Sequence, residues 1–218
     1  MALPLPVRNR LAELILDAFD DREARRTIRA LVDFCEARPG REDEGLSRLD
    51  GLGWFRRGAG GGLELLGAHR NHRDAICSRA RAAAAMLESD PGRCGEGLER
   101  LLVRAARLAD HGLYFEVHEL LEPVWLRAEG HERIALQGVI QVAVAFHHLQ
   151  GGNRAGAASR FVEGLSKLQA AGHMLPLSTE SWVHGLHRML AGLGEGELPG
   201  SVPPWPRPGS TREPRRSA

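Results

Sequence analysis

Apolar residues recur every three or four positions along most of the chain, which is the spacing of one face of an α-helix. In the second half this pattern predicts a series of helices near residues 98–110, 112–128, 131–150, 154–171 and 179–192. The turns between them are short, and short connections favour antiparallel neighbours. We therefore expect a helical bundle in this half of the chain.

The first half also predicts helices, but turn signals interrupt them more often. An apolar face running from Leu11 to Phe19 ends near Asp20, which forms a capping-box pattern with Glu23 and opens a second helix that ends near Ala37. A short third helix is expected over residues 42–49. Two apolar runs then flank the Gly-rich stretch RRGAGGG, which predicts a β-hairpin. This order of elements resembles a winged helix, and a helical hairpin with a flexible loop is the alternative.

These patterns predict a mainly α protein with a defined domain organisation. Residues 1–68 form a helical, winged-helix-like N-terminal domain, residues 69–97 a linking helix and loop, and residues 98–194 the antiparallel bundle. Residues 195–218 are dominated by proline, glycine and charged residues, a composition that buries too little apolar area to offset the entropy of ordering. We expect this C-terminal tail to be disordered.

Charge and hydropathy restrict the partners. The chain has 29 basic and 28 acidic residues and a net charge of +1, so no strong field attracts nucleic acid, and we expect no nucleic-acid partner. The most apolar stretch, Val139 to Phe146, contains Gln141 and is far shorter than the ~20 residues that span a bilayer, so we expect no membrane helix. The N-terminal half, in which basic and acidic residues balance, is a candidate for contacting a protein partner.

The cysteines and the N-terminus indicate a compartment. Cys35, Cys77 and Cys94 are an odd number without CxxC spacing, which argues against a disulfide framework and favours reduced thiols. The first residues combine early prolines with charges and lack the uninterrupted apolar segment of a signal peptide. We expect a cytoplasmic protein.

The candidate chemistry lies on one face of the expected helix 112–128. At ~100° per residue this face holds Tyr114, Phe115, His118, Leu121, Glu122 and Trp125. On the same wheel Glu116 and Glu119 point away and stay solvated. Because a buried carboxylate without a partner is costly, Glu122 needs a proton, a cation or a hydrogen-bond donor, and His118 is one such donor.

The next expected helix, 131–150, is apolar nearly all round and is the central helix of the bundle. A polar stripe on it carries Gln137, Gln141 and His148. If the two helices pack antiparallel, this stripe meets the stripe of His118 and Glu122 and forms a buried cluster of imidazoles, amides and a carboxylate. Beyond this helix, Asn153 suits an N-cap, and Gly156 with its alanine neighbours permits a close helix approach.

The segments YFEVHELLEPVW and LQGVIQVAVAFHHLQGGNRAGA closely resemble domain-of-unknown-function family 309, found in bacteria and archaea, over about residues 100–170. The family pattern of His, three residues, Glu, two residues, Trp falls on His118, Glu122 and Trp125. Its second block falls on Gln137, Gly138, Gln141, His148, Asn153 and Gly156. The resemblance implies a small all-helical bundle and a supposed role in metal binding, and it implies no established activity.

Three interpretations of the cluster remain open. In the first, His118, Glu122 and His148 bind zinc, iron or manganese in a hydrolase-like enzyme, while Tyr114, Trp125, Gln137 and Gln141 contact the ligand or support the metal-binding side chains. HELLE resembles the HExxH zinc signature, but Glu122 replaces its second histidine.

In the second interpretation the protein is a non-catalytic module that binds a small molecule or a protein partner, and the N-terminal half is an adaptor. A groove beside Trp125 then receives the ligand. In the third, the polar residues satisfy one another and only specify how the helices pack. The sequence does not decide whether the protein is an enzyme.

Overall fold

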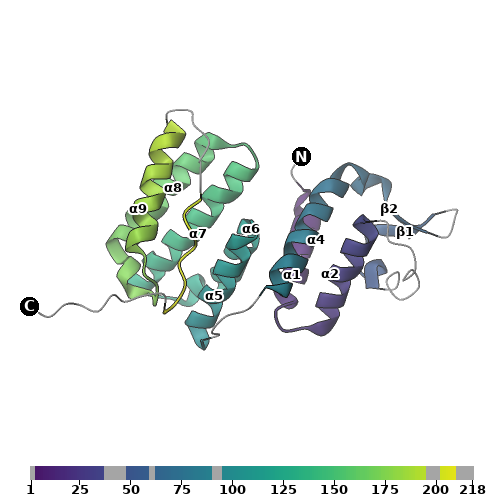
Figure 1. The fold of residues 1–218 in the computed structure, drawn as a ribbon, viewed down its shortest axis with the longest axis horizontal. Coiled ribbons are helices and arrows are strands. Elements are labelled where there is room, and N and C mark those ends of the chain that lie inside the picture. Colours follow the sequence, from purple (N-terminus) through teal and green to yellow (C-terminus); the bar gives the residue numbers. More distant parts are fainter. Residues whose placement is uncertain (1–2, 37–47, 59–61, 90–94, 195–201, 210–218) are drawn as a thin grey trace, which may run out of the picture. The chain divides into compact units, whose positions relative to one another are not determined.

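The computed structural model describes residues 3–36, 48–58, 62–89, 95–194 and 202–209. The chain divides into two compact units, Met1–Asp90 and Pro91–Ala218. Both consist mainly of helices, which confirms the mainly α fold class (Figure 1). None of the helices in the described ranges is long and apolar enough to cross a lipid bilayer.

The first unit combines helices with a small hairpin. It contains α1 (Leu5–Asp17), α2 (Arg22–Cys35), a helical turn at residues 48–50, β1 (Phe55–Arg57), β2 (Leu63–Leu65), the 3-10 helix η1 (Gly67–His72) and α4 (Arg73–Glu88). The two strands are antiparallel, with Phe55 opposite Leu65, so the predicted hairpin is confirmed. Of the helix expected at 42–49, residues 42–47 lie outside the described ranges.

The start of α2 differs from the prediction by one residue. Asp21 caps this helix, and its side chain accepts a hydrogen bond of 2.9 Å from the backbone N–H of Glu23. Asp20, the predicted cap, belongs to the turn that closes α1, because its N–H donates to the carbonyl of Asp17. The sequence correctly predicted an aspartate cap, but the cap is the second of two adjacent aspartates.

Helix α4, expected to link the two halves, packs against α2 within the first unit. The two helices run antiparallel, since Cys35 at the end of α2 is bonded to Cys77 near the start of α4 while Arg29 pairs with Glu88. The disulfide corrects the expectation of reduced thiols at these two positions. Helix packing brings the Cα atoms to 5.6 Å across a sequence separation of 42, which no local cysteine spacing reveals.

The second unit is the predicted bundle. It contains α5 (Gly97–Asp110), α6 (Tyr114–Arg127), α7 (Gly130–Gln150), α8 (Arg154–Ala171), the 3-10 helix η2 (Gly172–Met174) and α9 (Glu180–Gly194). Helix α7 packs most extensively against α8 and next against α6 (Figure 1). Its residues Leu136, Val139 and Val142 are fully buried, as expected for a central helix.

Helices α7 and α8 approach each other closely at two glycines. A Cβ added to Gly138 would lie 3.1 Å from the carbonyl oxygen of Gly164, and one added to Gly164 would lie 3.0 Å from that of Gly138. The sequence had suggested Gly156 for such an approach. Instead Gly156 lies against Asn153, the confirmed N-cap of α8, whose Oδ1 accepts from the Gly156 N–H at 2.9 Å.

Residues 202–209, called the strap below, pack on the second unit. Trp205 is only 4% exposed, and its ring centroid lies 4.7 Å from that of Trp182 and 6.4 Å from those of Tyr114 and Phe146. Arg207 also pairs with Asp110 at the end of α5. The strap therefore does not follow the expectation of a disordered tail. The rest of that tail, 195–201 and 210–218, lies outside the described residues.

Candidate metal centre

One side of α6 carries a polar group at the edge of its buried face. Phe115, Val117 and Leu121 are buried and hold the helix against its neighbours. His118 and Glu122, one helical turn apart, are half-buried beside them. The helix thus keeps both side chains reachable from solvent while fixing their backbone.

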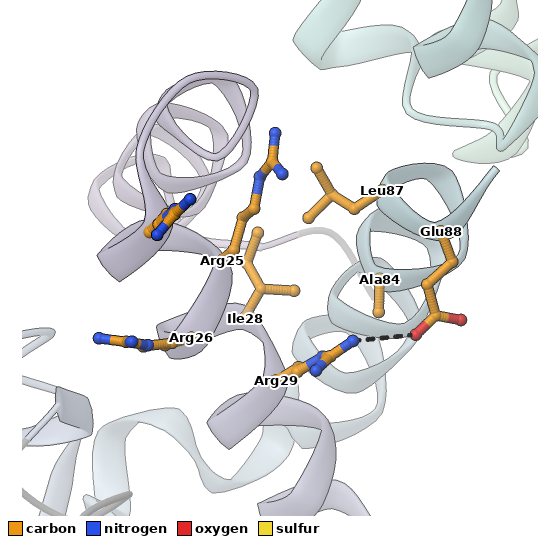
Figure 2. Close-up of a pocket in the computed structure, with 8 residues that line it drawn as sticks. Arg25, Arg26, Ile28, Arg29, Ala84, Leu87 and Glu88 are labelled. Carbon is orange, nitrogen blue, oxygen red and sulfur yellow. Dashed lines mark ion pairs between the residues drawn. The ribbon is translucent and has the colours of Figure 1, made fainter. Parts of the chain in front are cut away.

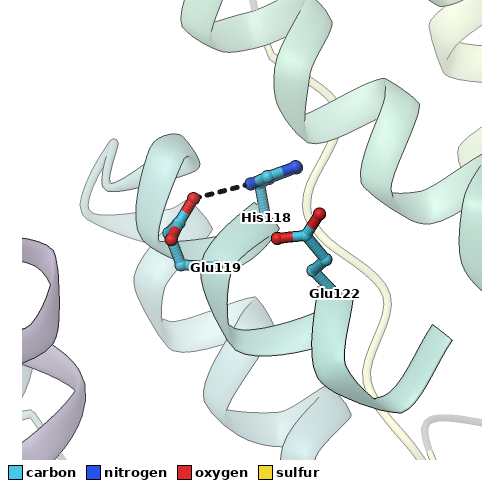
Figure 3. Close-up of side chains that lie close together, drawn as sticks. All are labelled: His118, Glu119 and Glu122. Carbon is cyan, nitrogen blue, oxygen red and sulfur yellow. Dashed lines mark hydrogen bonds and ion pairs between the residues drawn. The ribbon is translucent and has the colours of Figure 1, made fainter. Parts of the chain in front are cut away.

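Three side chains of α6 come together at this edge. Nδ1 of His118 donates a hydrogen bond of 2.9 Å to Oε1 of Glu119, and Glu122 lies beside them (Figure 3). One ligand atom from each residue lies within 4.8 Å of the others. Among the residues that the structure describes, this is the one group of three His, Cys, Asp or Glu side chains close enough to hold a metal ion.

The chemistry of this group suits a divalent cation. Two carboxylates and one imidazole within about one helical turn concentrate negative charge, and a bound cation offsets it. Imidazole nitrogen and carboxylate oxygen are ligands of zinc, iron and manganese. The His118 and Glu119 atoms, 2.9 Å apart, are close enough for both to reach one ion at about 2.1 Å. The side chains are 27% and 31% exposed, so water can reach such an ion.

Two glutamates of α6 differ from the prediction that they point into solvent. Glu119 bonds to His118, and Glu116 is 0% exposed and has an interaction partner. A helical wheel gives each residue one fixed direction, whereas a flexible glutamate side chain can turn toward its neighbour. The signal for Glu119 was already present in the HELLE segment, which places it directly after His118.

Gln141 is turned toward α8 and not toward the His118 group. Its Nε2 donates a hydrogen bond of 2.7 Å to Oε2 of Glu163, which also accepts from Arg160 at 2.9 Å. Gln141 is 8% exposed, so this bond satisfies part of a buried amide. The structure therefore gives Gln141 a role between α7 and α8, and Gln137 on the same helix is half-buried.

His148 lies near the C-terminal end of α7. Its Nδ1 accepts a hydrogen bond of 3.3 Å from Nδ2 of Asn153, the residue that caps α8. The group of three ligand atoms on α6 does not contain it. Of the three predicted metal ligands, the structure brings His118 and Glu122 together, and Glu119 completes the group.

The two aromatic residues predicted for the site, Tyr114 and Trp125, lie near opposite ends of α6. Tyr114 begins the helix, and its ring stacks on Phe146 with centroids 4.8 Å apart. Burial raises the pKa of the Tyr114 phenol, and the nearby Asp110 carboxylate raises it further. Trp125 is half-buried, with the Arg133 guanidinium 4.9 Å above its ring. Its buried Nε1 has no acceptor within the described part of the chain.

Part of the second unit matches a known protein family. Residues 102–159 match the family model described as "Domain of unknown function (DUF309)", so this part of the chain is a DUF309 domain. The match runs from α5 into α8 and includes the three residues of the candidate metal centre. Searches of curated proteins and of solved structures found no match.

Proposed function

We propose that the DUF309 domain binds one divalent metal ion through His118, Glu119 and Glu122. The observation that carries this proposal is the convergence of one imidazole and two carboxylates, with ligand atoms within 4.8 Å of one another. His118 and Glu122 are retained from the ligand set predicted from the sequence. Glu119 replaces His148, whose Nδ1 is engaged by Asn153.

A hydrolytic reaction is the chemistry that this arrangement supports best. His118, Glu119 and Glu122 would hold the ion and leave coordination positions open for water, and zinc bound in this way would supply a hydroxide near neutral pH. The partial exposure of His118 and Glu119 gives a substrate access to the same ion. The group differs from a zincin because Glu122 stands where that signature has its second histidine.

Elemental analysis of the full chain, purified without chelator and then equilibrated with Zn²⁺ or Mn²⁺, tests the proposal. We expect about one ion per chain. The variants His118→Ala, Glu119→Gln and Glu122→Gln should each lose most of it. The matched control is His131→Ala with Glu132→Gln, which alters an exposed His-Glu pair on α7. A metal content that is zero, or that survives His118→Ala, rules the site out.

The second candidate function is a non-catalytic module that binds a small molecule or a protein. It is supported by the hydrogen bond between Gln141 and Glu163, which connects α7 directly to α8. In that case the polar residues fix helix packing. The same variants distinguish the two: a metal-free native protein that is destabilised by His118→Ala favours this role.

A cytoplasmic location remains part of the proposal. The cysteine spacing was one of its two grounds, and the disulfide between Cys35 and Cys77 counts against a reducing compartment. The number of free thiols in the unreduced chain tests this location directly.

A further inference from the structure

A groove in the first unit lies between α2 and α4. It has a volume of about 260 Å³ (Figure 2). Its α2 wall carries four arginines, Arg22, Arg25, Arg26 and Arg29. Their spacing of three, one and three residues places them on one helix face, and the first and last are about 10 Å apart along the axis.

The charges of this wall are only partly neutralised. Arg26 pairs with Glu23, whose pKa is lowered mainly by that hydrogen bond. Arg29 faces Glu88 across the groove at 3.7 Å, and both side chains are about 70% exposed, at 71% and 69%, so this ion pair is weak (Figure 2). Four cations thus meet two carboxylates, which leaves the groove positive.

Arg25 is held in a fixed position. Its Nε and Nη2 donate hydrogen bonds of 2.6 and 2.7 Å to the carbonyls of Ala18 and Phe19. Because these acceptors are neutral carbonyl oxygens, they do not offset the positive charge of Arg25. The contacts also connect the end of α1 to α2, so Arg25 contributes to the fold and is a poor choice for a test.

The floor of the groove is apolar. Ile28 is fully buried at its base, and Ala84 and Leu87 of α4 are half-buried on its other side. A phosphate backbone would leave this floor unused, and the net charge of +1 provides no long-range attraction for nucleic acid. A ligand that uses both features carries carboxylates beside aliphatic or aromatic side chains.

We propose that the groove between α2 and α4 docks an acidic amphipathic peptide segment of a partner protein. Its carboxylates pair with the arginine wall, where planar guanidinium groups bind carboxylates by two parallel hydrogen bonds. Its apolar side chains cover Ala84 and Leu87, which are half-buried on α4. Two carboxylates about two helical turns apart on such a segment match the separation of Arg22 and Arg29. This surface is independent of the metal centre.

Selection from a library of random 15-residue peptides displayed on phage, with the immobilised full chain as bait, tests the proposal. Enriched sequences should interleave Asp or Glu with Leu, Ile or Phe. An enriched peptide is then synthesised with a fluorophore, and its affinity is measured by anisotropy. Sequences that are neutral or basic, or no enrichment over a blank support, would overturn the proposal.

Charge-reversal variants locate the binding surface. Arg22→Glu and Arg29→Glu should each weaken the peptide about tenfold, as expected when a contact with a charged partner is reversed. The matched control is Arg81→Glu, an exposed arginine of α4 outside the groove that changes the net charge equally. Glutamate at position 22 lies in the first turn of α2, where the helix dipole favours it, so folding is preserved.

Two further measurements complete the test. Leu87→Ala should weaken the peptide several-fold without changing the salt dependence of its affinity. Equal weakening by Arg81→Glu and Arg22→Glu would show unspecific attraction and reject the groove. Displacement of the peptide by an RNA oligonucleotide at a lower concentration than by unlabelled peptide would reject a peptide ligand.

Discussion

The indole rings of Trp182 and Trp205 lie against each other with centroids 4.7 Å apart, and this contact fixes the strap to the bundle. Trp182 belongs to α9, so the strap returns to the helix that precedes it in the chain. Gly185, one turn after Trp182, leaves room for the strap, because a Cβ there would lie 3.0 Å from the ring of Pro203. Trp205 is therefore the residue of the strap that joins the core of the second unit.

Replacing the strap tryptophan should destabilise the second unit. Trp205→Ala removes a buried aromatic side chain, and such truncations cost about 3 to 5 kcal/mol of unfolding free energy. Val202→Ala is the control in the same segment, since Val202 is 49% exposed. Chemical denaturation of both variants measures the difference. Equal stabilities would show that the strap does not pack in solution.

The stability of the second unit at alkaline pH should depend on the ionisation of Tyr114. Its pKa lies above the ordinary value of 10.0, first because of burial and second because of Asp110. The folded state therefore favours the neutral phenol, and its contribution is complete below pH 10 and is lost as the pH rises through the folded pKa. Tyr114→Phe should flatten this loss in denaturation experiments above pH 9.

The cause of the Tyr114 shift can be tested separately, because this residue is the one tyrosine of the sequence. Phenolate absorbance in a pH titration of the native chain therefore reports on Tyr114 without overlap. Asp110→Asn should lower the midpoint only partly, since burial is the larger cause. A native midpoint at or below 10.0 would contradict the burial of this side chain.

The disulfide predicts a definite thiol count. The sequence has three cysteines, and Cys35 and Cys77 are bonded, so an unreduced chain in denaturant should show the single thiol of Cys94. Reduction should expose all three and lower the stability of the first unit. For a bond spanning 42 residues, the loss of loop constraint corresponds to about 4 kcal/mol.

One outcome of the thiol count would contradict the disulfide. Three reactive thiols before reduction would support reduced cysteines and a reducing compartment. Cys94→Ser serves as the control, since it should remove the single thiol that reacts before reduction.

The close crossing of α7 and α8 should not tolerate a methyl group. Gly138→Ala places a Cβ 2.9 Å from Cγ of Leu168 and 3.1 Å from the Gly164 carbonyl, so the helices must separate. Overpacking of this kind costs about 1 to 3 kcal/mol. Gly151→Ala is the control, because its Cβ would meet nothing nearer than 3.5 Å. Similar thermal stabilities for the two variants would contradict the crossing.

Local patterns in the sequence were sufficient to predict where the helices lie. The apolar spacing predicted the bundle helices to within a few residues, and Asn153 was recognised as the cap of α8. Both features depend on residues only a few positions apart, which is the range over which helix periodicity and capping act. The resemblance over about residues 100–170 likewise indicated a DUF309 domain, and the family model matches residues 102–159.

The tertiary structure decided what depends on distant residues. The sequence by itself determined that His118 and Glu122 lie one turn apart, but packing directed Gln141 to Glu163, 22 residues away. Packing also joined Cys35 to Cys77 and buried Trp205. A periodic pattern gives the face on which a side chain lies, whereas its partner depends on which helix covers that face. That choice is made only when the whole core is assembled.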